Sequence, residues 1–212
     1  MSKRIIAIGG HVIKTARVEL EKVIERGHVE MLIHNGGSLF HDFQLATSTN
    51  LSHRQIHSYP LDEVVEDPGV ARRASYHVWE WVLGSKNYAP EKSITHLCHD
   101  LGIPVLMFTI PGADFWHLFK GGDAWAELGR AANHHFGVLR MRLRHPFHYV
   151  CMGSAVIHPE IFTKAISGRK LPEFKADVVD FLDMYRPRTR IAKYGKYYKM
   201  EHKEYLQKWL KE

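Results

Sequence analysis

The chain has 212 residues, of which 45% are hydrophobic and 25% are charged, with a formal net charge of +6 at pH 7. This is the composition of an ordinary globular domain, and a chain of this length buries a substantial core without disulfides or structural metals. The two cysteines, Cys98 and Cys151, stand far apart in apolar segments. We therefore expect buried free thiols, as in a reducing compartment.

The first apolar stretch, residues 5–8, is too short for a signal peptide or a membrane span. We therefore expect a cytoplasmic protein with no membrane partner. The 16 histidines form no cluster with ligand-like spacing, although His53 and His57 are four residues apart. No third ligand stands at a useful spacing, so no metal site is predicted.

The first fifty residues alternate between strand and helix patterns. Short β-branched runs end in glycine turns, and segments with helical spacing of apolar residues follow them. The predicted elements are a strand over 4–8, a helix over 11–26, a strand over 29–34 and a helix over 38–46. Short crossovers of this kind build parallel sheets.

The rest of the chain continues the same alternation after a polar surface excursion over 50–67. Helices are predicted over 70–83, 91–101, 125–143 and 158–167, and strands over 104–110, 147–152 and 177–182. The fold class predicted is α/β, a Rossmann-like parallel sheet with helices on both faces and a basic helical C-terminal tail. The predicted division is a nucleotide-binding domain over 1–192 and a basic aromatic tail over 193–212.

Four predicted strands each end in a turn of small residues. Because the carboxyl ends of parallel strands share one edge of the sheet, these turns are expected to meet there, where helix N-termini offer N–H groups to anions. A ligand with phosphates is the predicted occupant, and the alternative is that the glycines only make tight connections. The predicted cofactor contacts are Gly9, Gly10, Lys14, Asn35, Gly36, Gly37, Gly112, Asp114, Gly153, Ser154 and Ala155.

Charged and polar residues follow the same turns. Lys14 suits a phosphate or carboxylate, with plain solvent exposure as the alternative. Asp42 stands on the first turn of a predicted helix, where the macrodipole favours an acid, so it serves either the helix or a ribose hydroxyl or amine. The sequence has no Walker loop, no Gly-x-Ser-x-Gly and no His-Glu-x-x-His.

The C-terminal segment mixes basic and aromatic residues. This mixture is typical of surfaces that bind phosphate backbones and stacked bases. The alternative, which we prefer, is a solvated helix whose aromatic stripe packs on the body of the protein or on a neighbouring subunit. A nucleic-acid partner is therefore not expected.

Three motifs resemble deoxyhypusine synthase and its bacterial relatives. They are Gly9-Gly10-His11-Val12-Ile13-Lys14, Asn35-Gly36-Gly37-Ser38-Leu39-Phe40-His41-Asp42-Phe43 and Gly153-Ser154-Ala155-Val156-Ile157, followed by Asp183 and Tyr185-Arg186-Pro187-Arg188. The resemblance implies a Rossmann-like fold, NAD at the strand ends and a homo-oligomer, with a tetramer as in the synthase. This sequence lacks the synthase's histidine run and its Trp-Gly-Lys segment, so true deoxyhypusine transfer is not expected.

The resulting hypothesis is an NAD- or nucleotide-binding enzyme acting on a small amine or amino-acid-like substrate. Hydride transfer holds the cofactor ring against a carbon while acidic groups hold an ammonium. Asp42, Asp114 and Glu160 are the predicted ammonium holders and His41 the predicted proton carrier, so the predicted catalytic residues are His41, Asp42 and Glu160. The alternatives are a non-catalytic nucleotide-binding sensor or assembly subunit and, third, nucleic-acid binding through the tail.

Overall fold

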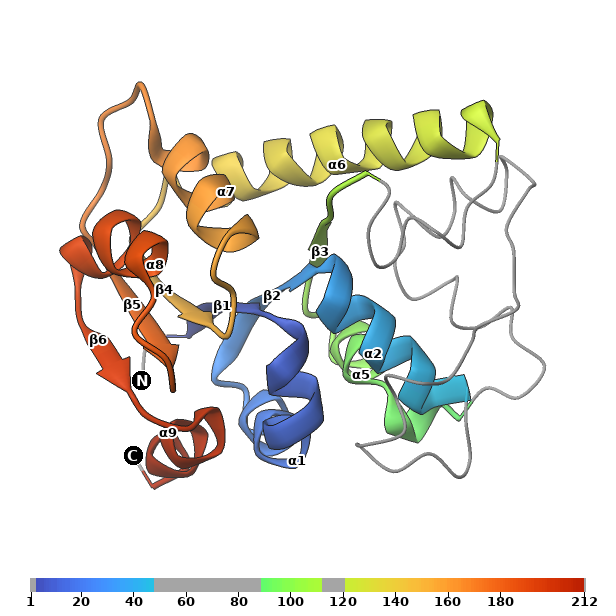
Figure 1. Ribbon diagram of the computed structural model, residues 1–212, viewed down its shortest axis with the longest axis horizontal. Coiled ribbons are helices and arrows are strands. Elements are labelled where there is room, and N and C mark those ends of the chain that lie inside the picture. Colours follow the sequence, from blue (N-terminus) through green and yellow to red (C-terminus); the bar gives the residue numbers. More distant parts are fainter. Residues whose placement is uncertain (1–2, 48–88, 112–120, 212) are drawn as a thin grey trace.

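The computed structural model describes residues 3–47, 89–111 and 121–211. Within these ranges six strands, all parallel, form one sheet in the order β3-β2-β1-β4-β5-β6 (Figure 1). The strands are β1 (Arg4–Ile8), β2 (Val29–Asn35), β3 (Val105–Phe108), β4 (Phe147–Met152), β5 (Phe174–Asp180) and β6 (Tyr197–Lys199). This strand order is that of the dinucleotide-binding Rossmann fold, and it confirms the predicted fold class.

Helices cover both faces of the sheet. They are α1 (Gly10–Glu25), α2 (Gly36–Thr47), α5 (Ile94–Asp100), α6 (Gly122–Arg142), α7 (Ile157–Ile166), α8 (Tyr185–Arg190) and α9 (His202–Trp209), with short 3-10 helices η2 (Pro90–Lys92) and η4 (Ala192–Tyr194). Figure 1 shows α6 and α7 on one side of the strands and α1, α5 and α9 on the other. No helix in the described ranges is long and apolar enough to cross a membrane.

The central strand β1 shows why the sheet is recognisable from sequence. Successive side chains of a strand point to opposite faces, so Ile5 and Ala7 pack with α6 and α7 while Ile6 and Ile8 pack with α1 and α9. All four are fully buried. A strand covered on both faces appears as a continuous apolar run, as the sequence of β1 does.

Several boundaries differ from the predictions. The predicted last strand begins at Phe174 and not at Asp177, and the predicted helix over 91–101 is η2 followed by α5. The break has a local cause, because the hydroxyl of Ser93 accepts a hydrogen bond from the backbone N–H of His96 and begins α5 there. The segments predicted over 50–67 and 70–83 lie outside the described residues.

The basic aromatic tail, residues 193–212, contributes to the sheet and to the core. Its strand β6 pairs with β5, and α9 packs on α1 with Leu206 fully buried and Trp209 2% exposed. This agrees with the preferred interpretation of the segment as a helix packed on the body. Cys98 and Cys151 are buried free thiols, as predicted, and burial raises the pKa of both.

Candidate functional site at the carboxyl edge of the sheet

The strand order reverses between β1 and β4. Chain segments leaving these two neighbouring strands turn to opposite faces, and in sheets of this kind ligands bind in the crevice outside the strand ends at this point. Here the turns are Gly9-Gly10 after β1 and Gly153-Ser154 after β4, and they begin the paths into α1 and α7. The structure thus brings two of the predicted turns together, and α2 begins beside them after β2.

The glycines in these turns are required by close contacts within the chain. A Cβ atom at Gly9 would lie 1.8 Å from the carbonyl oxygen of Gly153, and one at Gly10 would lie 2.9 Å from Cδ2 of His41. Gly153 itself has a φ of 64°, in the left-handed region that favours glycine. The tight-connection alternative therefore accounts for these glycines without a ligand.

A buried hydrogen-bond network ties the three turns together at the end of β1. The carbonyl oxygen of Ile8 accepts from Ser38 Oγ at 3.0 Å and from His158 Nε2 at 2.9 Å. Ser38 Oγ also lies 2.9 Å from Nδ1 of His34, and the backbone N–H of His158 donates to Ser154 Oγ at 3.3 Å. This network fixes the edge of the sheet before any ligand arrives.

The two histidines of this network are kept neutral. Burial lowers the pKa of His34 to about 4 even though the charge of Asp42 acts in the opposite direction. Burial likewise lowers the pKa of His158 to about 4. A buried imidazole with this pKa carries no charge at neutral pH, so both rings serve here as neutral hydrogen-bond partners.

This predicts acid sensitivity. Both histidines bind a proton more weakly in the folded state than in the unfolded state, so their contribution to stability is complete above pH 6.5 and is lost as the pH falls toward 4. The loss is on the order of 1–3 kcal/mol for each histidine. Urea denaturation at a series of pH values gives the unfolding free energy as a function of pH. This free energy is expected to fall less steeply with falling pH in His158→Gln than in the wild type, whereas the exposed control His145→Gln should keep the wild-type pH dependence. An equal pH dependence of the unfolding free energy in the two variants would contradict the assignment of the acid sensitivity to the buried histidines.

Asp42 has a different environment from the one predicted. Its fully buried carboxylate accepts hydrogen bonds from Ser93 Oγ at 2.9 Å, from the N–H of Ile94 at 2.8 Å and from the N–H of Thr95 at 3.0 Å. The two N–H groups belong to the first turn of α5, where backbone donors have no partner within the helix. The carboxylate is thus already occupied, and this position gives Asp42 a structural role in place of the predicted contact with an ammonium.

His41 is also engaged within the chain. It is 9% exposed, and its Nδ1 lies 2.8 Å from Oε1 of Gln44 one turn further along α2. Its ring packs against Gly10. The predicted proton carrier therefore lies at the carboxyl edge, with one ring nitrogen occupied.

Glu160 lies on the first turn of α7 at a separate cavity. The cavity, of about 370 Å³, is formed by the end of β3, α6 and α7, and its lining is apolar except for Thr109 and Glu160. The carboxylate forms ion pairs with Arg190 and, at 3.9 Å, with Arg186, both from α8. The structure therefore places Glu160 beside cationic groups and not in one cluster with Asp42.

The remaining predicted contacts divide by exposure. Gly9, Gly36 and Ser154 are buried, whereas Gly10, Lys14, Asn35, Gly37, Gly153 and Ala155 are half-buried at the edge. Gly112 and Asp114 lie outside the described residues. Within the described ranges, no group of three or more histidine, cysteine or acidic side chains is arranged to hold a metal ion.

One group of residues at this edge was not predicted as a site. His11 on α1 lies with its ring centroid 4.7 Å from that of Phe181 and 5.5 Å from that of His202 on α9. Asp180, 5% exposed at the end of β5, has a pKa raised by burial and partly lowered again by hydrogen bonding and by the charge of His11. Only His11 had a sequence signal, its place directly after Gly9-Gly10.

His202, the first residue of α9, contacts the rings of both His11 and Phe181. It is fully buried, and burial together with the charge of His11 lowers its pKa to about 4. A Cβ atom at Gly153 would lie 3.1 Å from its Cε1, so its ring packs directly on the turn after β4. The carboxyl edge thus carries one half-buried histidine beside an acid and a neutral histidine.

Comparison with solved structures confirms the fold. A conserved LOR/SDH protein from Methanococcus maripaludis superposes with a TM-score of 0.62 at 14% identity, covering 99% of this chain and 60% of that one. ArgZ, an arginine dihydrolase from cyanobacteria, gives 0.60 at 16% identity, and AgrE in complex with ornithine and NAD+ gives 0.61 at 13%. The superpositions cover 99% of this chain for ArgZ and 97% for AgrE. In both cases this chain spans only 29% of the length of the other protein.

At these identities the likeness establishes the Rossmann-like fold and nothing more specific. No protein-family model matches the sequence, and no curated protein matches it. The structures named above do not include a deoxyhypusine synthase, so the resemblance to that family rests on the sequence motifs alone. The shared fold is the conclusion that motifs and structures support together.

Proposed function

We propose that this chain binds a nucleotide of the NAD class at the carboxyl edge of its sheet. The observation that carries the proposal is the strand order, which places the turns after β1 and β4 side by side at the reversal point, with α1 beginning at Gly10. The complex of AgrE with ornithine and NAD+ supports it, because that protein shares the fold.

The same neighbours and the cavity beside Glu160 support a proposal for the substrate class. AgrE and ArgZ are structures of proteins that bind or act on ornithine and arginine. In this chain Glu160 lines a mainly apolar cavity and pairs with Arg186 and Arg190, so an amino acid bound there would replace these ion pairs with contacts to its own ammonium and carboxylate. We therefore propose a small amino-acid-like ligand, and retain the deoxyhypusine synthase-like family as the proposed origin of the motifs.

The site differs from the usual dinucleotide fingerprint in two places. The turn after β1 runs Gly9-Gly10-His11-Val12-Ile13-Lys14 and lacks the G-x-G-x-x-G spacing. The residue at the end of β2 is Asn35 where an acid normally binds the ribose, and its Oδ1 accepts a hydrogen bond from the N–H of Ser38 at 2.8 Å. A bound nucleotide would therefore depend on Lys14, His11 and backbone N–H groups.

A second candidate is nucleotide binding without catalysis. It is favoured by the engagement of the predicted catalytic groups: Asp42 by α5, His41 by Gln44 and Glu160 by two arginines. A chain of this kind would serve as a sensor or assembly subunit. The predicted homo-oligomer remains part of both candidates, and analytical ultracentrifugation tests it.

Thermal melting with and without NAD or NADH tests the proposal. A ligand present at about 100 times its dissociation constant adds roughly 2.7 kcal/mol of stability, so the midpoint is expected to rise. His11→Gln should weaken NAD binding about threefold to tenfold through loss of contact at the start of α1. Lys203→Gln, on α9 and paired with Glu19, is the control and should bind as wild type. No rise with either nucleotide would sink the proposal.

A further inference from the structure

The cavity beside Glu160 has a lining that suits one class of side chain. We propose that the amino-acid ligand carries a medium-sized apolar side chain, such as that of leucine or phenylalanine, which enters this cavity. The inference rests on the proposed amino-acid ligand and adds the nature of its side chain. Such a ligand differs from ornithine, which is bound in the AgrE complex, and from arginine, on which ArgZ acts.

Two helices each turn an apolar stripe to the cavity. Ala132 and Phe136 are four residues apart on α6, and Ile157 and Ile161 are four residues apart on α7, so each pair lies on one face of its helix. Phe136, Ile157 and Ile161 also pack against the buried core that contains Phe108. The core therefore holds these walls in place before a ligand binds.

Two large apolar side chains of the lining are exposed. Ile110, after β3, is 50% exposed, and Val156, before α7, is 40% exposed. Exposed apolar groups gathered around one cavity are typical of ligand-binding surfaces, and a volume of about 370 Å³ lies within the range of ligand pockets. An apolar side chain that enters the cavity removes this surface from water, which favours binding.

The charged groups of the cavity provide no partner for a cationic side chain. Glu160 is the only acid among the residues that line it, and it pairs with Arg190 and, at 3.9 Å, with Arg186. In the bound state the ammonium and carboxylate of the amino acid itself replace these ion pairs. The side-chain ammonium of ornithine or the guanidinium of arginine would then lose its hydration in an apolar space without a partner. The cavity therefore selects an uncharged side chain.

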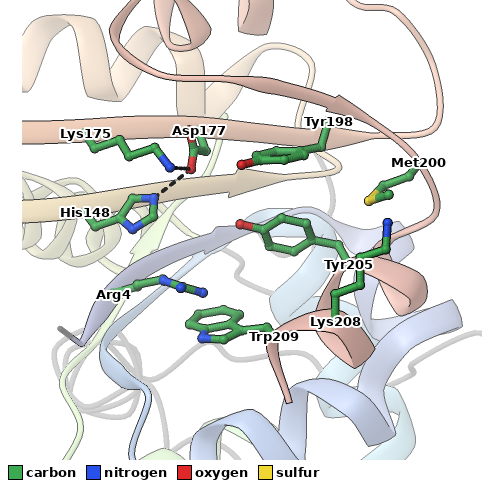
Figure 2. Close-up of a pocket in the computed structure, with 9 residues that line it drawn as sticks. All are labelled: Arg4, His148, Lys175, Asp177, Tyr198, Met200, Tyr205, Lys208 and Trp209. Atoms are coloured by element: carbon green, nitrogen blue, oxygen red, sulfur yellow. Dashed lines mark hydrogen bonds and ion pairs between the residues drawn. The ribbon is translucent and has the colours of Figure 1, made fainter. Parts of the chain in front are cut away.

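The pocket at the amino-terminal edge of the sheet has the opposite character. Figure 2 shows its charged groups around one space, which has a volume of about 170 Å³. Asp177 lies 2.8 Å from His148 Nε2 and 2.8 Å from Lys175 Nζ, and Arg4 and Lys208 line the same space. A lining of this kind offers little to an apolar group, so of these two cavities the one beside Glu160 suits the proposed side chain.

Isothermal titration of the full chain with a panel of amino acids tests the proposal. The panel is leucine, phenylalanine, alanine, ornithine and arginine, each titrated with and without saturating NAD. Leucine or phenylalanine should bind at least about tenfold tighter than ornithine and arginine, because the cationic groups lose their hydration. Alanine should also bind at least about tenfold more weakly than leucine, because its methyl group leaves most of the cavity unfilled.

A substitution on α6 tests whether the side chain occupies the cavity. Ala132→Phe places a ring in the cavity and should weaken leucine binding by at least about tenfold. Ala126→Phe adds the same ring at an exposed position of α6 outside the cavity lining and should bind leucine as wild type.

A second variant reports on the cavity without a change in the core. Ile110→Ser removes an exposed part of the wall, so the fold should tolerate it, and should weaken leucine binding about threefold to tenfold. Leu101→Ser is the matched control, because Leu101 is 49% exposed at the end of α5 and does not line the cavity.

The outcomes separate this inference from the proposed function. Ornithine or arginine binding as tightly as leucine or more tightly would overturn the apolar side chain and leave the proposed amino-acid ligand in place. Absence of binding by all five amino acids would overturn both. Equal affinities for leucine in Ala132→Phe and Ala126→Phe would overturn the placement in the cavity. Thermal melting with NAD alone reports separately on the nucleotide site.

Discussion

Replacing Asp42 with alanine is expected to cost about 3–4 kcal/mol of unfolding free energy. The substitution leaves the Ser93 hydroxyl and the N–H groups of Ile94 and Thr95 buried without their acceptor. Asp42→Asn retains one acceptor oxygen and should cost about half as much. Urea denaturation followed by circular dichroism measures both.

Asp100 provides the matched control for this prediction. It lies at the other end of α5, its side chain is 58% exposed, and its partner is His96 at 3.3 Å. An exposed pair of this kind contributes little, so Asp100→Ala should change stability by less than about 0.5 kcal/mol. If Asp42→Ala costs no more than Asp100→Ala, the carboxylate does not hold α5, and a ligand-binding role regains support.

Replacing Gly9 with alanine is expected to be the most damaging small substitution at the carboxyl edge. The new Cβ would lie 1.8 Å from the Gly153 carbonyl oxygen, a backbone atom that moves only if β1 and β4 separate. We expect a loss of at least about 3 kcal/mol or failure to fold, since overpacking of this kind costs up to that amount where side chains still adjust. Thermal melting of the purified variant measures it.

Gly137 supplies the control. It is exposed within α6, and no described atom lies within 4 Å of a Cβ built on it. Alanine there should raise stability by roughly 0.5–1 kcal/mol, because glycine is a poor helix residue. Equal effects of Gly9→Ala and Gly137→Ala would show that the turns after β1 and β4 are not pressed together as described.

The central strands were predictable because their environment is simple. β1 and β4 were predicted at Arg4–Ile8 and Phe147–Met152, which are the bounds observed. Both strands lie between helical layers, so nearly every side chain is apolar and a turn of small residues follows. A local pattern suffices when burial is complete on both faces.

Strand β6 escaped prediction because nothing local marks it. It has three residues, Tyr197, Tyr198 and Lys199, at the edge of the sheet inside a basic segment. Tyr197 pairs with Val178, which lies nineteen residues earlier, so a local sequence pattern cannot reveal the pairing. Edge strands are short and partly polar, so they resemble the loops around them.

In the candidate site, too, the features set by topology were predictable and the contacts set by tertiary packing were not. That the turns after β1, β2 and β4 share one edge follows from parallel topology and was predicted. What occupies Asp42 and Glu160 was not, because Ser93 and Arg190 reach them through tertiary packing over 51 and 30 residues. His202 and Asp180 meet His11 for the same reason, since three distant segments converge on the end of β5.

Hydrogen–deuterium exchange of the full chain with and without saturating NAD is the most direct test of nucleotide binding at the carboxyl edge. We expect slower exchange over residues 8–14 and 153–158, at the starts of α1 and α7, with no change around Lys175 and Lys208 at the other edge. Protection confined to the amino-terminal edge, or no protection anywhere, would contradict it.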